Sequence, residues 1–277
     1  MSDISNDTGI SYHINEYIVI NELVKLFPEP FFKLLEITDF AAGSIADLSS
    51  LLTAFEIQAA IPEPTLVVNN TKIIHITYAG FENLKKVTEA LISVAKKLYK
   101  HVIKAHKPDT FWLRIYVAQP GFLKKPASVF TSIESFLYSV EYVSLGKFLD
   151  GDKFWGDFTL KAAAAPRVTP GFTPTPEELV KLILAPLGQV AGDRRKFAEK
   201  VLNLANSLLT GPCAVKPLAL VLGAVLSFVP LETIFGLMGQ EKTLELLNVL
   251  AEGPNFKALI AALKAGRIVR PLGDLNP

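Results

Sequence analysis

The sequence of 277 residues contains one cysteine, Cys213, and no apolar run long enough to span a bilayer. A single cysteine cannot form an intrachain disulfide, which is typical of a reducing compartment, and we expect Cys213 to be a small buried residue. The longest apolar run, Pro217 to Leu231, has 15 residues, whereas a transmembrane helix needs roughly 20, so we expect a buried helix. The first residues carry acids and no basic segment followed by an apolar block. We therefore expect no classical secretory signal and a cytoplasmic or virion location.

Motifs that indicate a particular enzyme chemistry are also missing. The sequence has no GxxxxGK[ST] loop, no GxGxxG after a predicted strand and no GxSxG turn. His101 and His106 lie roughly 140° apart around a helix, so they cannot chelate one metal ion as an i,i+4 pair would. The acidic segment 150–157 suggests a calcium loop, but Phe154 and Lys161 occupy ligand positions, so we expect a surface turn. The sequence predicts no catalytic residues, metal or cofactor, although an enzyme with dispersed catalytic residues remains an alternative.

The sequence does show a strong separation of charge along the chain. Residues 1–64 hold 10 acids and 2 bases, a net charge of −8, and residues 65–130 hold 3 acids and 11 bases, a net charge of +8. The rest of the chain is nearly balanced, so the total is only +1. The two blocks either neutralise each other within one molecule, meet between molecules, or leave the basic block for a polyanion.

The lysines between Leu84 and Lys107 are the most concentrated positive segment. This stretch contains seven lysines and one acid, Glu89, and it lies between Gly80 and Pro108. At about 100° per residue, its leucines and valines gather on one side and its lysines on nearly the opposite side. We expect an amphipathic helix whose basic face is either simply solvated or binds phosphates. The candidate phosphate contacts are Lys96, Lys97, Lys100, Lys104 and Lys107.

Further basic and aromatic residues follow the lysine segment and recur in the second half of the chain. Cations that contact phosphates and flat rings that stack on bases are what single-stranded nucleic acid requires, although each ring taken singly fits a core position better. The further candidates are Arg114, Tyr116, Phe122, Lys124, Lys125, Arg194, Arg195 and Lys196. The last three open a predicted helix capped by Asp193, where positive charge opposes the helix dipole and an anion would offset it.

Local patterns predict the elements of the first half of the chain. Alternation of apolar and polar residues predicts an extended arm over 10–20, and an N-cap-like start predicts a helix over 45–60. Two β-prone runs around Asn69-Asn70 predict a hairpin, and residues 111–118 predict a strand. An apolar periodicity predicts a helix that begins at Pro126, runs through Val140 and is ended by Gly146.

The second half is predicted to be helical. Residues 162–176 are rich in proline and small residues and predict a linker, and an N-cap Thr175 followed by Pro176 and the acids Glu177 and Glu178 predicts a helix start. The helices are expected over 176–185, 193–210, 217–229, 231–238, 240–252 and 255–265.

The predicted fold is therefore mainly α with a small β component, in two lobes: an α+β N-terminal lobe with a hairpin and an all-α C-terminal lobe. The expected parts are an extended N-terminal arm (1–27), an N-terminal lobe (28–161), a linker (162–176), a C-terminal lobe (177–265) and a C-terminal tail (266–277). This layout resembles the plan of viral nucleoproteins, in which arms link neighbouring subunits and RNA lies between two lobes; the similarity is one of organisation only.

These features favour a non-enzymatic, self-assembling protein that binds single-stranded nucleic acid, with RNA as the expected partner. The arm would bind a neighbouring subunit, with the tail as a possible second contact. The arm's candidate contacts are Tyr12, Ile14, Tyr17, Ile18 and Ile20. One alternative is a protein–protein scaffold or effector with complementary charged segments. A second alternative is a membrane-surface or lipid-binding protein, although the apolar side of the lysine segment lacks the aromatic residues typical of interfacial helices.

Overall fold

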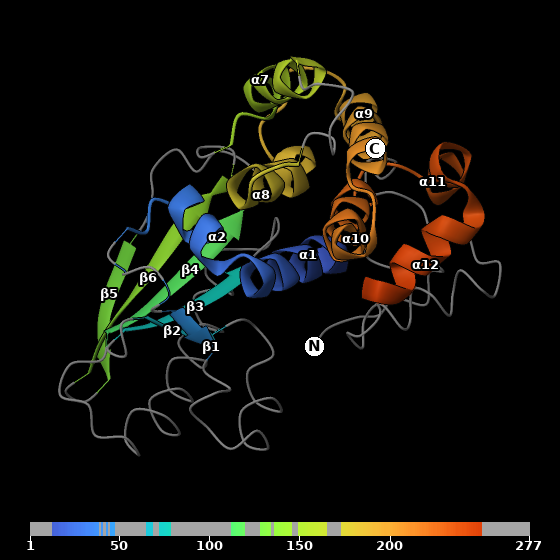
Figure 1. Ribbon diagram of the computed structural model, residues 1–277. Helices are drawn as coiled ribbons and strands as arrows, with labels where there is room; N and C mark the ends of the chain where they lie inside the picture. Colours follow the sequence, from blue (N-terminus) through green and yellow to red (C-terminus); the bar gives the residue numbers. More distant parts are fainter. Residues whose placement is uncertain are drawn as a thin grey trace, which may run out of the picture. The chain divides into compact units, whose positions relative to one another are not determined.

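The computed structural model describes residues 13–38, 40, 43, 45–47, 65–68, 72–78, 112–119, 128–133, 136–145, 149–164 and 173–250. These residues are mostly helical, with a smaller β component, as the sequence predicts (Figure 1). The chain divides into two compact units: Ile20–Asp150, and Met1–Val19 together with Gly151–Pro277. The division lies between Asp150 and Gly151, before the predicted linker over 162–176. Residues 162–164 of the predicted linker belong to a helix, and residues 165–172 lie outside the described ones.

The unit formed by Ile20–Asp150 contains a six-stranded mixed sheet. Its strands are β1 (Ile45–Asp47), β2 (Thr65–Val68), β3 (Lys72–Tyr78), β4 (Trp112–Gln119), β5 (Ser128–Ile133) and β6 (Phe136–Ser144). Their spatial order is β1-β2-β3-β4-β6-β5 (Figure 1). β2 and β3 pair antiparallel with Val68 opposite Lys72, whereas β4 is parallel to both of its neighbours, β3 and β6.

The N-terminal arm predicted to be extended is a helix from its thirteenth residue onward. α1 covers His13–Leu26 and is followed by the short helix α2 (Pro28–Leu34). Val19, Ile20, Leu23 and Val24 of α1 are all buried, and a spacing of i, i+1, i+4 and i+5 is that of one helix face. The alternation that predicted a strand covers only three apolar residues, and it is overridden by this longer helical pattern.

Strands take the place of two predicted helices of the same unit, the first only at residues 45–47 and the second throughout its described part. The segment predicted as a helix over 45–60 begins with β1, and its remaining residues lie outside the described ones. The helix predicted from Pro126 to Val140 is replaced by β5 and β6, which pair antiparallel with Ile133 opposite Phe136. The Val, Phe, Ile and Tyr residues of this predicted helix are of types that favour strands. Pairing with other strands is non-local, so a short periodic apolar pattern cannot reveal it.

The second unit is built from helices whose bounds largely agree with the prediction. They are α7 (Gly151–Ala164), α8 (Pro176–Leu184), α9 (Arg194–Leu208), α10 (Val215–Val225), α11 (Leu231–Met238) and α12 (Gln240–Leu250). Short 3₁₀ turns, η3 (Ala185–Leu187) and η4 (Pro212–Ala214), follow α8 and α9. The helix predicted over 255–265 and the tail 266–277 lie outside the described residues.

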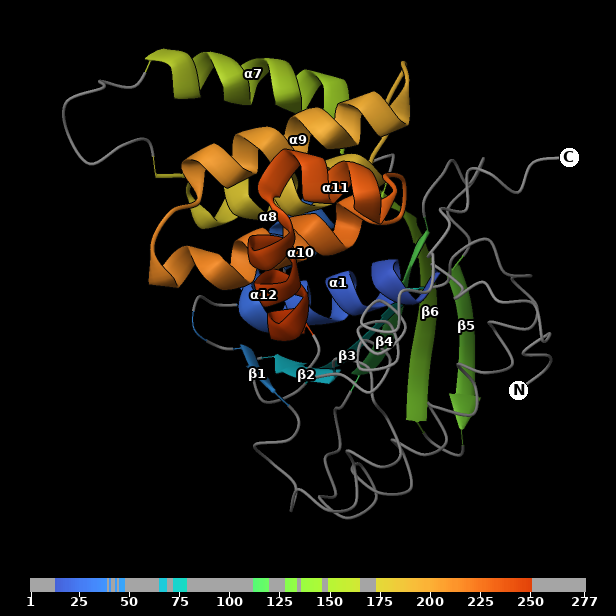
Figure 2. The ribbon, with the colours of Figure 1, turned by 90° about the vertical axis from the view of Figure 1, so that its right-hand side faces the viewer.

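α10 is the centre of this helical unit. Each of its residues from Pro217 to Val225 is buried, which agrees with the uninterrupted apolar sequence that predicted a buried helix. α10 packs against α8, α9 and α12, as Figure 2 shows. At Gly223 the packing is tight, because a Cβ atom there would lie 2.7 Å from Val19 Cγ2 and 3.3 Å from Leu250 Cδ1.

Two smaller expectations for this unit are wrong. Residues 151–157 of the acidic segment, expected to be a surface turn, form the first half of α7, in which Phe158 is buried and the ring centres of Phe154 and Phe158 lie 5.1 Å apart. Cys213, expected to be buried, is exposed in η4. The apolar residues on either side of Cys213 suggested burial, but η4 has no buried residue.

Candidate nucleic-acid interface

Most of the predicted nucleic-acid contacts lie in parts of the chain that the structure does not describe. These residues are Lys96, Lys97, Lys100, Lys104, Lys107, Phe122, Lys124 and Lys125. Their role as a basic track therefore remains a prediction from the sequence.

Arg114 and Tyr116 are the two candidates on the sheet. Both belong to β4, where Arg114 is in register with Ile74 and Ser139, and Tyr116 with Ile76 and Glu141. β4 is an interior strand with neighbours on both sides. The backbone at both positions is therefore part of the ladder, as the prediction of a strand over 111–118 requires.

Arg194 is held by groups of its own helical unit. Its Nη2 donates a hydrogen bond to the carbonyl oxygen of Gly188 at 3.0 Å, and its Nη1 lies 3.5 Å from the carbonyl oxygen of Pro186. Its guanidinium also lies 5.1 Å from the centre of the Phe228 ring, a favourable cation–π arrangement. These contacts tie the start of α9 to the end of η3, so the structure gives Arg194 a structural role.

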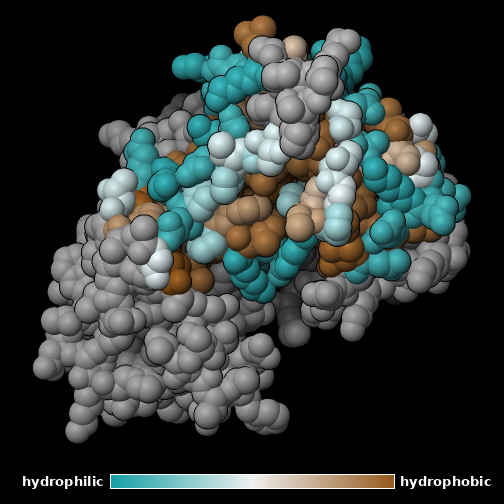
Figure 3. Space-filling model, viewed as in Figure 1, coloured by the Kyte–Doolittle hydropathy of each residue, from teal (hydrophilic) through white to brown (hydrophobic). Residues whose placement is uncertain are grey.

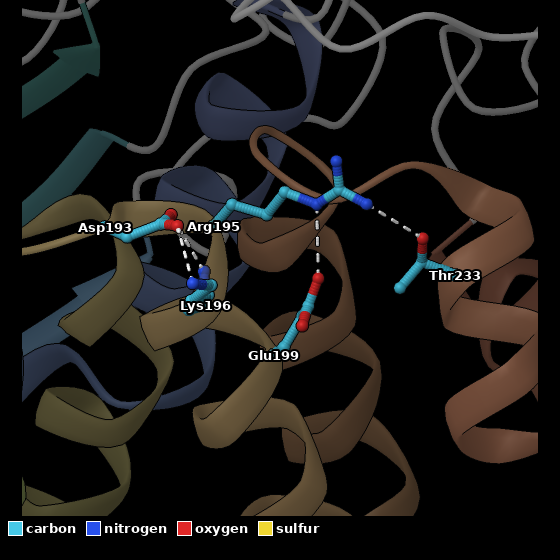
Figure 4. Close-up of polar contacts among 5 residues, drawn as sticks. All are labelled: Asp193, Arg195, Lys196, Glu199 and Thr233. Atoms are coloured by element: carbon cyan, nitrogen blue, oxygen red, sulfur yellow. Dashed lines mark hydrogen bonds and ion pairs between the residues drawn. The ribbon is translucent and has the colours of Figure 1, made fainter.

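Arg195 and Lys196 are more exposed, and each makes contacts within the unit (Figure 4). Arg195 bonds through Nε to Glu199 Oε1 at 3.2 Å and through Nη2 to Thr233 Oγ1 at 3.2 Å, with its side chain 52% exposed. Lys196 Nζ lies 3.8 Å from Asp193 Oδ2, and its side chain is 78% exposed. An exposed pair of this kind contributes little to stability, so Lys196 can exchange Asp193 for an outside anion at small cost.

The predicted cap of α9 is present. The side chain of Asp193 accepts a hydrogen bond from the backbone N–H of Lys196 at 3.2 Å. This carboxylate lies at the positive end of the helix dipole, where it offsets the unfavourable arginines and lysine of the first turn. The local electrostatic cost expected from the sequence is therefore reduced within the molecule.

Lys200 is a basic residue of this surface that the sequence reasoning missed. It is exposed and lies four residues after Lys196 on α9, so the two lysines are neighbours on the same side of the helix. The i,i+4 spacing was available in the sequence as a signal. Figure 3 shows hydrophilic residues on the visible face of this helical unit, with hydrophobic residues between them.

A second charged contact joins α7 to α8. Lys161 Nζ lies 2.8 Å from Glu178 Oε1, and Glu178 also completes a capping box with Thr175. Hydrogen bonding to Glu178 raises the pKa of Lys161. Partial burial alone would raise the pKa of Glu178, but the hydrogen bonds from Lys161 and Thr175 outweigh it and lower that pKa. Both groups are therefore charged near neutral pH and stabilise the start of α8.

A cavity of about 470 Å³ lies in the helical unit near η4. Leu179, Ser207, Leu209, Cys213 and Pro217 are among the residues that line it, and none of the lining residues is charged. A phosphate group in this cavity would lose water without gaining a cation. The cavity is therefore no part of the candidate interface.

The predicted oligomerisation residues lie mainly on α1. Ile14, Tyr17 and Ile18 belong to this helix, and Tyr12 precedes the described residues. Ile20 is fully buried. A buried isoleucine reaches a neighbouring subunit only after local rearrangement, and the oligomerisation role of Ile20 stays a prediction from the sequence.

Comparison with protein-family models, with curated proteins and with solved structures finds no match for this chain. Within the described ranges, no helix is both long and apolar enough to cross a membrane. The same ranges contain no group of three or more His, Cys, Asp or Glu residues arranged to hold a metal ion.

Proposed function

We propose that this protein is a non-enzymatic, self-associating protein that binds single-stranded RNA through the phosphates of its backbone. The observation that carries the proposal is the segregation of charge: 11 bases against 3 acids in residues 65–130 of a chain whose net charge is only +1. A one-sided concentration of lysine is the electrostatic footprint of a polyanion partner.

Strand topology supports a continuous basic surface. β3 and β4 are parallel neighbours, and parallel neighbours require a connection that returns across the sheet. The 33 residues between Tyr78 and Trp112 make this connection and include the predicted lysine helix. In the proposal, the leucine and valine stripe of that helix packs on the sheet, and the lysines from Lys96 to Lys107 contact phosphates.

The two compact units serve as the two lobes of this protein. Lys124 and Lys125 extend the basic track in the first lobe. In the second lobe, Arg195 and Lys196 contribute phosphate contacts together with Lys200, because these side chains are exposed. Arg194 supports this surface indirectly, since its guanidinium holds the start of α9.

The salt dependence of RNA binding tests the proposal. If about five of these cations engage phosphates of a single strand at one time, Lys100 and Lys104 among them, log affinity falls with log salt at a slope near −3.5, which is roughly 100-fold between 50 and 200 mM. Lys100→Gln with Lys104→Gln removes two of these contacts and changes the slope to about −2.1. Lys25→Gln with Lys153→Gln removes the same charge from exposed positions of α1 and α7 and leaves the slope near −3.5. A slope near zero for the unmodified protein contradicts the proposal.

A protein scaffold with complementary charged segments is the second candidate. The same observation favours it, because residues 1–64 carry −8 against the +8 of residues 65–130. In that case the two blocks neutralise each other between molecules, and light scattering detects large assemblies at low salt without nucleic acid. Dissociation of these assemblies by salt, together with a flat RNA-binding slope, identifies the scaffold.

A further inference from the structure

The two edges of the sheet differ in length and in charge. β1, at one edge, has three residues and ends in Asp47. β5, at the other edge, has six residues, SVFTSI, and among the described strands it pairs with β6 alone (Figure 1). All six positions of β5 are in continuous register with β6, from Ser128 opposite Glu141 to Ile133 opposite Phe136. β5 is thus a regular strand without a bulge.

The sequence of β5 lacks the features that usually protect an edge strand. An edge leaves backbone N–H and C=O groups that point away from the sheet, and proteins commonly block further pairing with lysine, proline, a bulge or a very short strand. β1 is short and carries a charge, whereas β5 contains no charged residue, proline or glycine. Its valine, phenylalanine, threonine and isoleucine are residues that favour strand pairing.

We propose that the β5 edge is the site of self-association, where β5 of a second copy of this chain pairs antiparallel with it. The absence of charge favours this partner, because two identical strands placed side by side then bring no like charges together. An edge strand without charge does not attract RNA or a charged peptide. The inference deepens the self-association in the proposed function, and it supplies an interface in place of the extended arm, since α1 is helical and Ile20 is buried.

Such a pair obeys a strict geometric rule. On an edge strand, only alternate residues direct their backbone N–H and C=O groups outward. Two residues that lie opposite each other across the new antiparallel ladder must therefore either both direct these groups toward the partner strand or both direct them away from it. In a two-fold antiparallel pair, one residue of β5 therefore lies opposite its own copy, with Cα atoms about 5 Å apart. At about 3.4 Å per residue along the strand, the next residue lies roughly 8 Å from its copy, beyond the usual disulfide range of about 4.4–6.8 Å.

A cysteine scan of the full-length protein tests the rule without RNA. The background variant is Cys213→Ser, which removes the one native thiol. Single cysteines replace each residue from Ser128 to Ile133 in turn, and Asn203→Cys, at an exposed position of α9, is the control. After mild oxidation, disulfide-linked dimer is expected at one β5 position, at least fivefold above its neighbours and the control. Uniform cross-linking along β5, or none above the control, overturns the proposal.

A charge variant tests the same edge independently of cysteine chemistry. Ser132→Lys adds a charge to β5, and Asn203→Lys adds the same charge to α9. In sedimentation at matched concentration, Ser132→Lys is expected to be a monomer and Asn203→Lys a dimer, with equal circular dichroism. If Ser132→Lys unfolds, the cysteine scan decides. RNA-binding slopes measured on both variants test the proposed function separately, because a monomer can retain its phosphate contacts.

Discussion

Replacement of Gly223 by alanine tests the packing at the centre of the helical unit. A Cβ atom at this position would lie 2.7 Å from Val19 Cγ2 and 3.3 Å from Leu250 Cδ1. The stiff β-branched valine cannot turn away easily, so the added methyl must displace a helix. Overpacking of this kind costs about 1–3 kcal/mol, whereas alanine is better than glycine within a helix by about 1 kcal/mol. We therefore expect Gly223→Ala to lower the free energy of unfolding by up to about 2 kcal/mol.

The matched control is Gly236→Ala on α11. Gly236 is also helical, but a Cβ atom there meets no other atom within 4 Å. The Gly236→Ala variant should therefore gain up to about 1 kcal/mol in free energy of unfolding from helix propensity alone. Urea unfolding followed by circular dichroism and tryptophan fluorescence measures both variants. Val19→Ala should relieve most of the cost in the Gly223→Ala background. If Gly223→Ala stabilises the protein as much as Gly236→Ala does, the described packing of Val19 and Leu250 against Gly223 is wrong.

Two further predictions concern stability. Burial lowers the pKa of His75 from 6.5 to about 4, so between these pH values the unfolded chain binds a proton that the folded chain excludes. The free energy of unfolding therefore falls by about 1.4 kcal/mol per unit as pH drops from 6.5 to 4, about 3 kcal/mol in all. Urea titrations at several pH values should show that the free energy of unfolding of His75→Leu depends less on pH. An unchanged pH dependence in this variant would contradict a buried neutral histidine. Thr175→Ala removes the hydroxyl that accepts from Glu178 N at 3.2 Å and should cost about 1 kcal/mol. Thr175→Ser should retain most of that stability, and equal losses in the two variants would exclude a capping role.

The helical unit was largely predictable because its signals are local. Thr175, Pro176 and Glu178 specify the start of α8 through a capping box and a first-turn proline. Asp193 caps α9, and Gly211-Pro212 interrupts the chain before α10. Such features depend on neighbours three or four residues away, so the sequence contains the whole of the evidence for them.

The sheet was less predictable because its pairings are non-local. Nothing near Ser128 indicates that this segment lies beside β6, and the spacing of Val129, Phe130 and Ile133 fits a helix equally well. The candidate site has the same difficulty. Arg194 is identified as a structural residue only by the carbonyl oxygen of Gly188 and the ring of Phe228, which the fold brings to it.

Purification without nuclease, followed by absorbance at 260 and 280 nm and by light scattering, tests RNA coating most directly. We predict an absorbance ratio well above that of protein alone, in a particle much larger than the 30.3 kDa chain. Ribonuclease treatment should lower both the ratio and the particle mass. A monomer with the absorbance ratio of pure protein, unchanged when single-stranded RNA is added at low salt, would contradict the account.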